Sequence, residues 1–76
     1  MNAKRRRELN KIIETLNETV SQLGDLESEE RDAADNMPES MWGTEKHERL
    51  EENGDTLSDC IQDIEDVIGN LEEVVS

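Results

Sequence analysis

The sequence predicts an all-α fold, an antiparallel helical hairpin that dimerises into a four-helix bundle. Two segments of the chain carry leucine, isoleucine and valine at helical spacing. Between them lies MPESMWG, residues 37–43, which holds the only proline and the only tryptophan. Apolar residues that are equally distant from Trp42 can face one another, as an antiparallel hairpin requires.

The first helix is expected over about residues 3–36. Counted from Leu9 at heptad position a, its apolar residues are Leu9, Leu16 and Leu23 at a, Ile12 and Leu26 at d, and Ile13 and Val20 at e. Occupation of a, d and e is typical of an amphipathic helix with a broad apolar stripe. Asn36 is a suitable C-cap, and Pro38 cannot continue the helix because it lacks a backbone N–H.

The turn is expected over about residues 37–44 and the second helix over about residues 45–75. Thr44 is a favourable N-cap, and Glu45 and Glu48 place negative charge in the first turn, where it suits the helix dipole. The heptads resume as Leu57, Ile64 and Leu71 at a, Cys60, Val67 and Val74 at d, and Ile61, Ile68 and Val75 at e. The phase is kept across Asn53-Gly54, so the helix either continues through this pair or breaks there.

One antiparallel register, centred on Trp42, pairs the two apolar stripes. The facing pairs are Leu9–Val75, Leu16–Ile68, Val20–Ile64, Leu23–Ile61 and Ala34–Leu50. Trp42 then lies at the tip of a hairpin about 45 Å long, from roughly 30 residues per arm at 1.5 Å rise. Pro38 and Gly43 supply the turn.

A hairpin is expected to bury positions a and d and to leave position e exposed. The expected dimer interface is Ile13, Val20, Ile61, Ile68 and Val75. An apolar strip of this length normally marks an interface, and small helical domains often need oligomerisation for stability. A homodimeric four-helix bundle would cover the strip. Cys60, at position d, is expected to be a small core residue.

Composition disfavours several classes of function. The 76 residues include 21 acidic and 8 basic side chains, a formal net charge of −13. This charge disfavours direct binding to nucleic acid or to an anionic membrane, and it favours a cationic partner. No apolar run approaches the roughly 18 residues of a membrane span, and no signal peptide is recognisable, so a cytoplasmic location is expected. The single cysteine agrees with a reducing compartment.

No catalytic or cofactor-binding constellation is recognisable, so the protein is expected not to be an enzyme and to need no cofactor. The segment DTLSDCIQDIED, residues 55–66, lacks the glycine and the ligand order of a calcium loop. A two-metal site in a helical bundle would need inward Glu-x-x-His motifs. His47 is the only histidine, and it lies near the tip. No metal site is therefore expected.

The basic run Lys4, Arg5, Arg6 and Arg7 lies at a helix N-terminus, where cations are unfavourable. In the hairpin it faces Glu72 and Glu73, so it is expected to clamp the two helices together. A nucleic-acid patch is the alternative, and it is disfavoured because no aromatic residue is interleaved with the bases.

The second helix carries a band of carboxylates, and no lysine or arginine follows Arg49. Such a band resembles the regular negative charge of a phosphate backbone. It could equally be a solvated face that keeps the bundle in solution. Trp42 is either a lid over Met37, Met41 and Leu50 or an anchor for a partner, since tryptophan is enriched at binding hot spots. The candidate partner-binding residues are Asp55, Asp59, Asp63, Asp66, Glu73 and Trp42.

The start KRR, the spacing L-x-x-I-I, the turn NMPES and the spacing I-x-x-I-E-D-x-I run through most of the chain. In these features the chain resembles a group of small acidic helical-hairpin proteins of phages and prophages of Gram-positive bacteria. The resemblance implies a phage context and carries no catalytic signature. The Trp42-Gly43 turn also resembles, in architecture alone, the secreted WXG hairpins.

Two functions follow as hypotheses. The first is a phage-type inhibitor that mimics nucleic-acid charge and blocks a basic host or defence protein, as anti-CRISPR proteins do. The second is a structural or adaptor homodimer whose acids serve only solubility.

Overall fold

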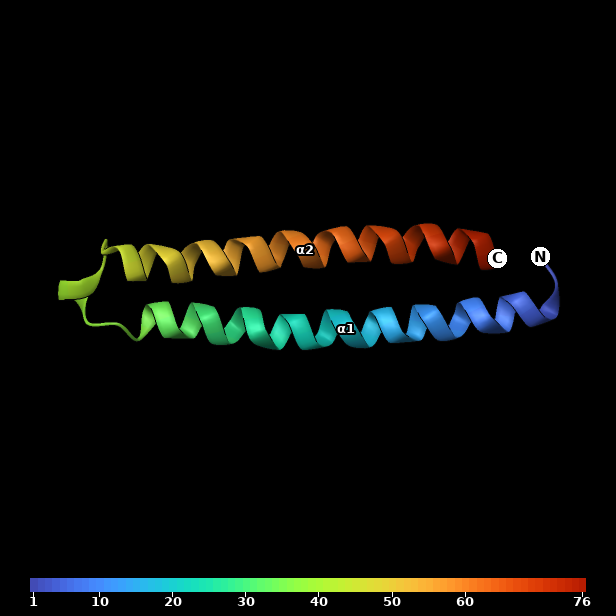
Figure 1. The fold of residues 1–76 in the computed structure, drawn as a ribbon, viewed down its shortest axis with the longest axis horizontal. Helices are drawn as coiled ribbons and strands as arrows, with labels where there is room; N and C mark the ends of the chain where they lie inside the picture. The colour runs from blue at the N-terminus through green and yellow to red at the C-terminus, as the bar shows by residue number, and fades with distance from the viewer.

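The computed structural model describes residues 1–76 as two long helices that pack antiparallel (Figure 1). Helix α1 spans Ala3–Asp35, the short 3-10 helix η1 spans Glu39–Met41, and α2 spans Glu45–Val75. There is no strand, so the predicted all-α hairpin is confirmed. The rod measures 60 × 15 × 13 Å. It is longer than the predicted 45 Å because the arms have 33 and 31 residues and the turn extends beyond them.

The helix ends lie within one residue of the predicted ones because local capping sets them. The Asn2 side chain accepts a hydrogen bond from the backbone N–H of Arg5 at 2.8 Å, and Thr44 accepts one from that of His47 at 3.4 Å. Asn36 is the C-cap of α1. Helix α2 is continuous through Asn53-Gly54, which settles the alternative that the sequence left open.

Gly43 makes the turn possible. Its φ of +84° is the only positive φ in the chain, and a side chain would be strained there. The hydroxyl of Thr44 also donates to the carbonyl of Met41 at 2.6 Å, which ties the turn to the start of α2.

The helices face each other through positions a and e. The most buried large side chains are Ile13 and Ile68, at 8% and 6% exposure, and both are at position e. At position d, Ile12, Leu26, Val67 and Val74 are about half exposed, and Cys60 is exposed. The prediction that e residues form an outer interface is therefore wrong. Ile13, Val20, Ile61, Ile68 and Val75 line the contact between α1 and α2, and Cys60 is not a core residue.

The tip half of the rod explains this choice of face. There, position e holds Ala34, His47 and Gly54, and all three are buried. Position d holds Ala33, Lys46 and Asn53 at the same levels. Residues four apart are about 40° apart around a helix, whereas residues three apart are about 60° apart. The a/e stripe is therefore the narrower one, and near the tip of α2 its side chains are small or neutral. This stripe faces inward along the whole helix pair.

Candidate functional site

The predicted acidic residues of α2 are all exposed to solvent, as a charged binding surface requires. These residues are Asp55, Asp59, Asp63, Asp66 and Glu73. Only Asp55 forms an ion pair, with the guanidinium of Arg31 at 3.3 Å. Asp66 accepts a hydrogen bond from the amide of Gln62 at 3.2 Å. No basic side chain pairs with the other three, so their charge faces water uncompensated.

Three of these acids form a straight row on the outermost side of α2. Asp59, Asp66 and Glu73 occupy position c, about 160–180° away from the buried stripe. Successive members are two turns apart, roughly 10.5 Å along the axis. Asp63 lies between two of them but is turned toward the side that carries Val67. The band is therefore one row flanked by further carboxylates, and Asp55 is set apart from it by its ion pair.

The acidic band has a charge spacing close to that of a nucleic-acid strand. Nine carboxylates lie between residues 51 and 73 of α2, and no base occurs among them. At 1.5 Å rise per residue, this is one negative charge per about 3.7 Å of axis. One strand of duplex DNA carries one per about 3.4 Å. The match concerns spacing along the axis only, because the carboxylates point to several sides of the helix.

A polar crossing connects α1 and α2 toward the tip of the rod, and sequence reasoning did not find it. Arg31 extends over the buried Gly54 to Asp55, and its Nε lies 3.9 Å from Glu27. Next to it, the amide of Asn53 donates to Glu30 at 3.0 Å. The signal was present, because carboxylates interrupt the apolar stripe of the first helix at an e and an a position.

Trp42 at the tip is half covered and half exposed. Its indole N–H donates to the carbonyl of Met37 at 2.9 Å, and its ring stacks on His47 with centroids 5.8 Å apart. The side chain remains 51% exposed. The ring thus shields His47, which the sequence did not predict. Half of the indole remains available to a partner.

His47 is the buried polar residue of the tip, at 7% exposure. Its Nδ1 accepts a hydrogen bond from the backbone N–H of Gly43 at 3.4 Å. Its Nε2 lies 3.4 Å from a carboxylate oxygen of Glu51. The imidazole therefore joins the turn to the first two turns of α2 and fixes the angle at which Trp42 is presented.

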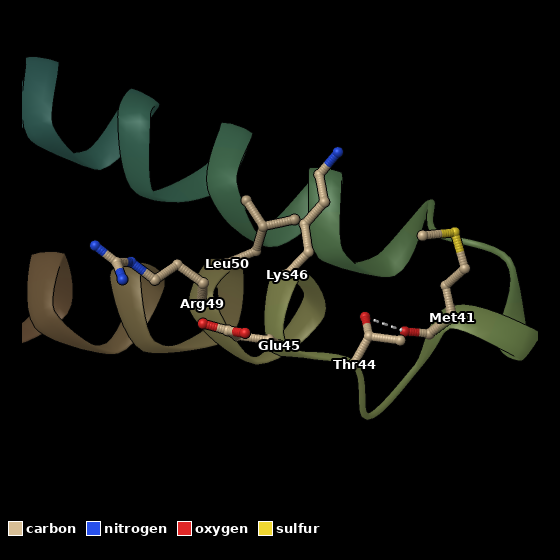
Figure 2. Close-up of a pocket in the computed structure, with 6 residues that line it drawn as sticks. All are labelled: Met41, Thr44, Glu45, Lys46, Arg49 and Leu50. Carbon is tan, nitrogen blue, oxygen red and sulfur yellow. Dashed lines mark hydrogen bonds between the residues drawn. The ribbon is translucent and has the colours of Figure 1, made fainter.

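Beside the tip, a hollow of about 530 Å³ is lined by Met41, Thr44, Glu45, Lys46, Arg49 and Leu50 (Figure 2). The charged ends of Lys46 and Arg49 diverge from each other and point out of the hollow (Figure 2). Its floor is apolar, from Met41 and Leu50. No set of polar groups converges there as a small-molecule site would need.

At the open end, the basic run forms fewer contacts than predicted. Arg6 donates from Nε to the carbonyl of Val75 at 3.1 Å and from Nη2 to that of Met1 at 3.2 Å. No ion pair forms with Glu72 or Glu73. The clamp therefore consists of one hydrogen bond between the helices, and Lys4, Arg5 and Arg7 remain unpaired.

No group of three or more His, Cys, Asp or Glu side chains is placed to hold a metal ion. Neither helix contains a stretch apolar enough to cross a membrane. The chain matches no protein-family model, no curated protein and no solved structure.

Proposed function

We propose that the chain is a non-enzymatic acidic binding protein, which mimics nucleic-acid charge and blocks a basic nucleic-acid-binding protein. The single supporting observation is the unpaired carboxylate row of α2. Asp59, Asp66 and Glu73 face solvent on the outermost side of a straight helix, with no cation beside them. A groove that holds a phosphate backbone presents the complementary row of lysines and arginines.

The shape of the molecule also suits this role. A rod 60 Å long and 15 Å wide is narrow enough to lie in the groove of a protein that binds nucleic acid, because it carries no large domain that would block entry. The net charge of −13 steers it toward basic surfaces and raises the rate of association. The phage and cytoplasmic setting, including an anti-CRISPR-like target, is proposed on the sequence resemblance and composition alone.

Displacement from DNA provides a test. A lysate of a Gram-positive bacterium is passed over DNA-cellulose, and the bound proteins are challenged at low salt with the purified protein. The test variant is Asp59→Asn, Asp63→Asn and Asp66→Asn together. Its matched control is Glu14→Gln, Glu18→Gln and Asp25→Asn, which removes the same charge from exposed positions of α1.

The proposal predicts that wild type and control release the same basic proteins, while the α2 variant releases at least about tenfold less. The difference should shrink as salt rises, because screening weakens exposed charge interactions. Equal loss in both variants would mean that net charge alone matters. Release that is unchanged by the α2 variant would contradict the mimic.

The exposed half of Trp42 favours one second candidate, an adaptor that docks through its tip. Trp42 and Met41 are 51% and 39% exposed at the end of the rod. An adaptor predicts that Trp42→Ala abolishes binding to a captured protein, while the triple Asn variant binds like wild type. A helicity measurement on Trp42→Ala is the control, because the indole also holds Met37 and His47.

A further inference from the structure

One side of the hairpin carries apolar side chains that the isolated chain leaves in water. This exposed stripe consists of Ile12, Leu26, Cys60, Val67 and Val74. Both helices bury positions a and e and run antiparallel, so position d of each is turned by the same angle toward the same side of the rod. The stripe thus forms one continuous strip on the half of the rod near the termini.

The hairpin alone encloses little. Only 5 of the 76 residues are buried, and no side chain is less than 2% exposed. A small domain with so thin a core usually depends on oligomerisation or on covalent cross-links. Cys60 has no partner within the chain, so no internal disulfide supplies the missing stability.

Two oppositely charged segments lie on α1 at equal distances from Thr19. Residues 3–11 hold five bases and one acid, and residues 27–35 hold five acids and one base. The centre of the exposed stripe lies at the same level, beside Thr19 and Val67. When two copies pair through the stripe, their relative direction therefore determines which charged segments lie next to each other.

We infer that the stripe binds a second copy of the chain, in an antiparallel dimer whose two-fold axis passes beside Thr19 and Val67. In this arrangement α1 lies on the α1 of the second copy, and α2 on its α2. Ile12 meets the second copy's Leu26, Cys60 faces its Val74, and Val67 meets its own counterpart. Segment 3–11 of each copy lies along segment 27–35 of the other.

Charge favours this dimer over a parallel one. In a parallel dimer the two-fold axis would run along the rod and place α1 on the second copy's α2. Segment 3–11 would then meet Glu72 and Glu73, but the acidic segment 27–35 would lie beside Glu51, Glu52 and Asp55. The antiparallel dimer brings opposite charges together twice, and opposite charges steer register as well as association. Each copy carries −13, so the favourable contacts at segment 3–11 offset part of the repulsion between the copies.

The size of the overlap is sufficient for a stable pair. Residues 3–35 of α1 overlap over about 48 Å at 1.5 Å rise. With the 15 Å width of the rod, this is roughly 720 Å² of projected face per copy, against about 800 Å² of buried surface in a standard interface.

An open groove marks the tip-side end of this overlap. It has a volume of about 470 Å³ and is lined by Leu26, Glu29, Glu30, Asn53, Thr56 and Leu57. The second copy's Ile12 comes level with Leu26 and Leu57. The second copy's Arg5 comes within reach of Glu29 and Glu30. The groove therefore offers apolar and acidic contacts to the side chains that the dimer brings to it.

The dimer does not depend on the proposed function, and charge reversal tests it. Sedimentation equilibrium at low salt is compared for wild type, for Arg5→Glu with Arg7→Glu, and for the control Lys46→Glu with Arg49→Glu, nearer the tip. We expect the first variant to dimerise at least about tenfold more weakly and the control to change by less than about threefold. Mixing the first variant with Glu29→Lys, Asp32→Lys copies should restore dimers, since both contacts are again between opposite charges.

Disulfide trapping tests the direction. In a Cys60→Ser background, Val67→Cys should form a covalent dimer under mild oxidation, because this position meets its counterpart only in the antiparallel pair. The outward Asp59→Cys should not. A wild type that stays monomeric at about 100 µM would overturn the dimer. No cross-link at residue 67 in copies that do dimerise would overturn the antiparallel arrangement.

Discussion

Replacing Gly54 by alanine tests how closely α1 and α2 approach at the polar crossing. A Cβ built on Gly54 lies 3.1 Å from Cγ and 3.2 Å from Nη1 of Arg31, which is tighter than ordinary contact. A Cβ on Gly69, in the same helix, meets nothing within 4 Å. The two glycines therefore form a matched pair. At both positions alanine is favoured over glycine by the same helix propensity, and only the contact with Arg31 differs.

The expected magnitudes follow from this geometry. Alanine is favoured over glycine in a helix interior by about 0.8–1.0 kcal/mol, so Gly69→Ala should stabilise the protein by nearly that amount. At Gly54 the same gain is offset because Arg31 must shift away from Asp55 and Glu27. Both are exposed ion pairs, each worth about 0–1 kcal/mol. Gly54→Ala should therefore lie between a loss and a gain of about 1 kcal/mol, below Gly69→Ala.

Thermal and urea unfolding, followed by helicity at one fixed protein concentration, measure both variants. The fixed concentration matters because association shifts apparent stability. For a chain of this size 1 kcal/mol corresponds to about 4–8 °C in Tm. In an Arg31→Ala background the Gly54→Ala gain should rise to that of Gly69→Ala. If Gly54→Ala stabilises the wild type as much as Gly69→Ala does, the contact with Arg31 has no cost. If Gly54→Ala destabilises strongly and Arg31→Ala gives no relief, contact with the backbone is limiting and Arg31 is not the cause.

Three further predictions concern the interior and the caps. In urea unfolding below the dimer dissociation constant, Ile13→Ala should cost about 2–4 kcal/mol and its exposed neighbour Ile12→Ala less than about 1 kcal/mol; equal costs would contradict the a/e interior. Ile64→Asp should abolish cooperative unfolding, because an unpaired carboxylate would lie between the helices, and an unchanged Tm would show that Ile64 does not face α1. Thr44→Ala should cost about 1 kcal/mol of stability in the same unfolding assay, and no loss would mean that the cap at α2 is redundant.

The helix ends could be predicted from the sequence because they depend on a few adjacent residues. Thr44 caps α2 through a hydrogen bond to a residue three positions on, and Pro38 ends α1 by removing a donor. The register could be predicted because apolar residues repeat on both arms. Contacts between Arg31 and Asp55 and between Glu30 and Asn53 agree with the predicted register to within two residues.

The inward face could not be read from the apolar residues alone. Positions d and e are both apolar in the half of the chain near the termini. In this half, either a/d or a/e could face the partner helix. The decision is made near the tip, by Ala34, His47 and Gly54. Counting back by sevens from Ile61 reaches Gly54 and then His47, so the signal lay in small and polar residues rather than in large apolar ones. The stacking of Trp42 on His47 follows from the same row.

Position d, rather than the predicted position e, is exposed, and this changes how the proposed dimer is placed relative to the acidic row. Had e been outside, the second copy would have covered a face about 160° from the acidic row at position c. With d outside, the two faces are only about 100° apart around α2. The dimer covers Val67 and leaves Asp59, Asp66 and Glu73 at its outer edge. Because the two copies run antiparallel, their acidic rows run in opposite directions along one longer rod. A single basic groove would then meet carboxylates from both copies, so dimerisation lengthens the charged surface without hiding the residues that the proposed function requires.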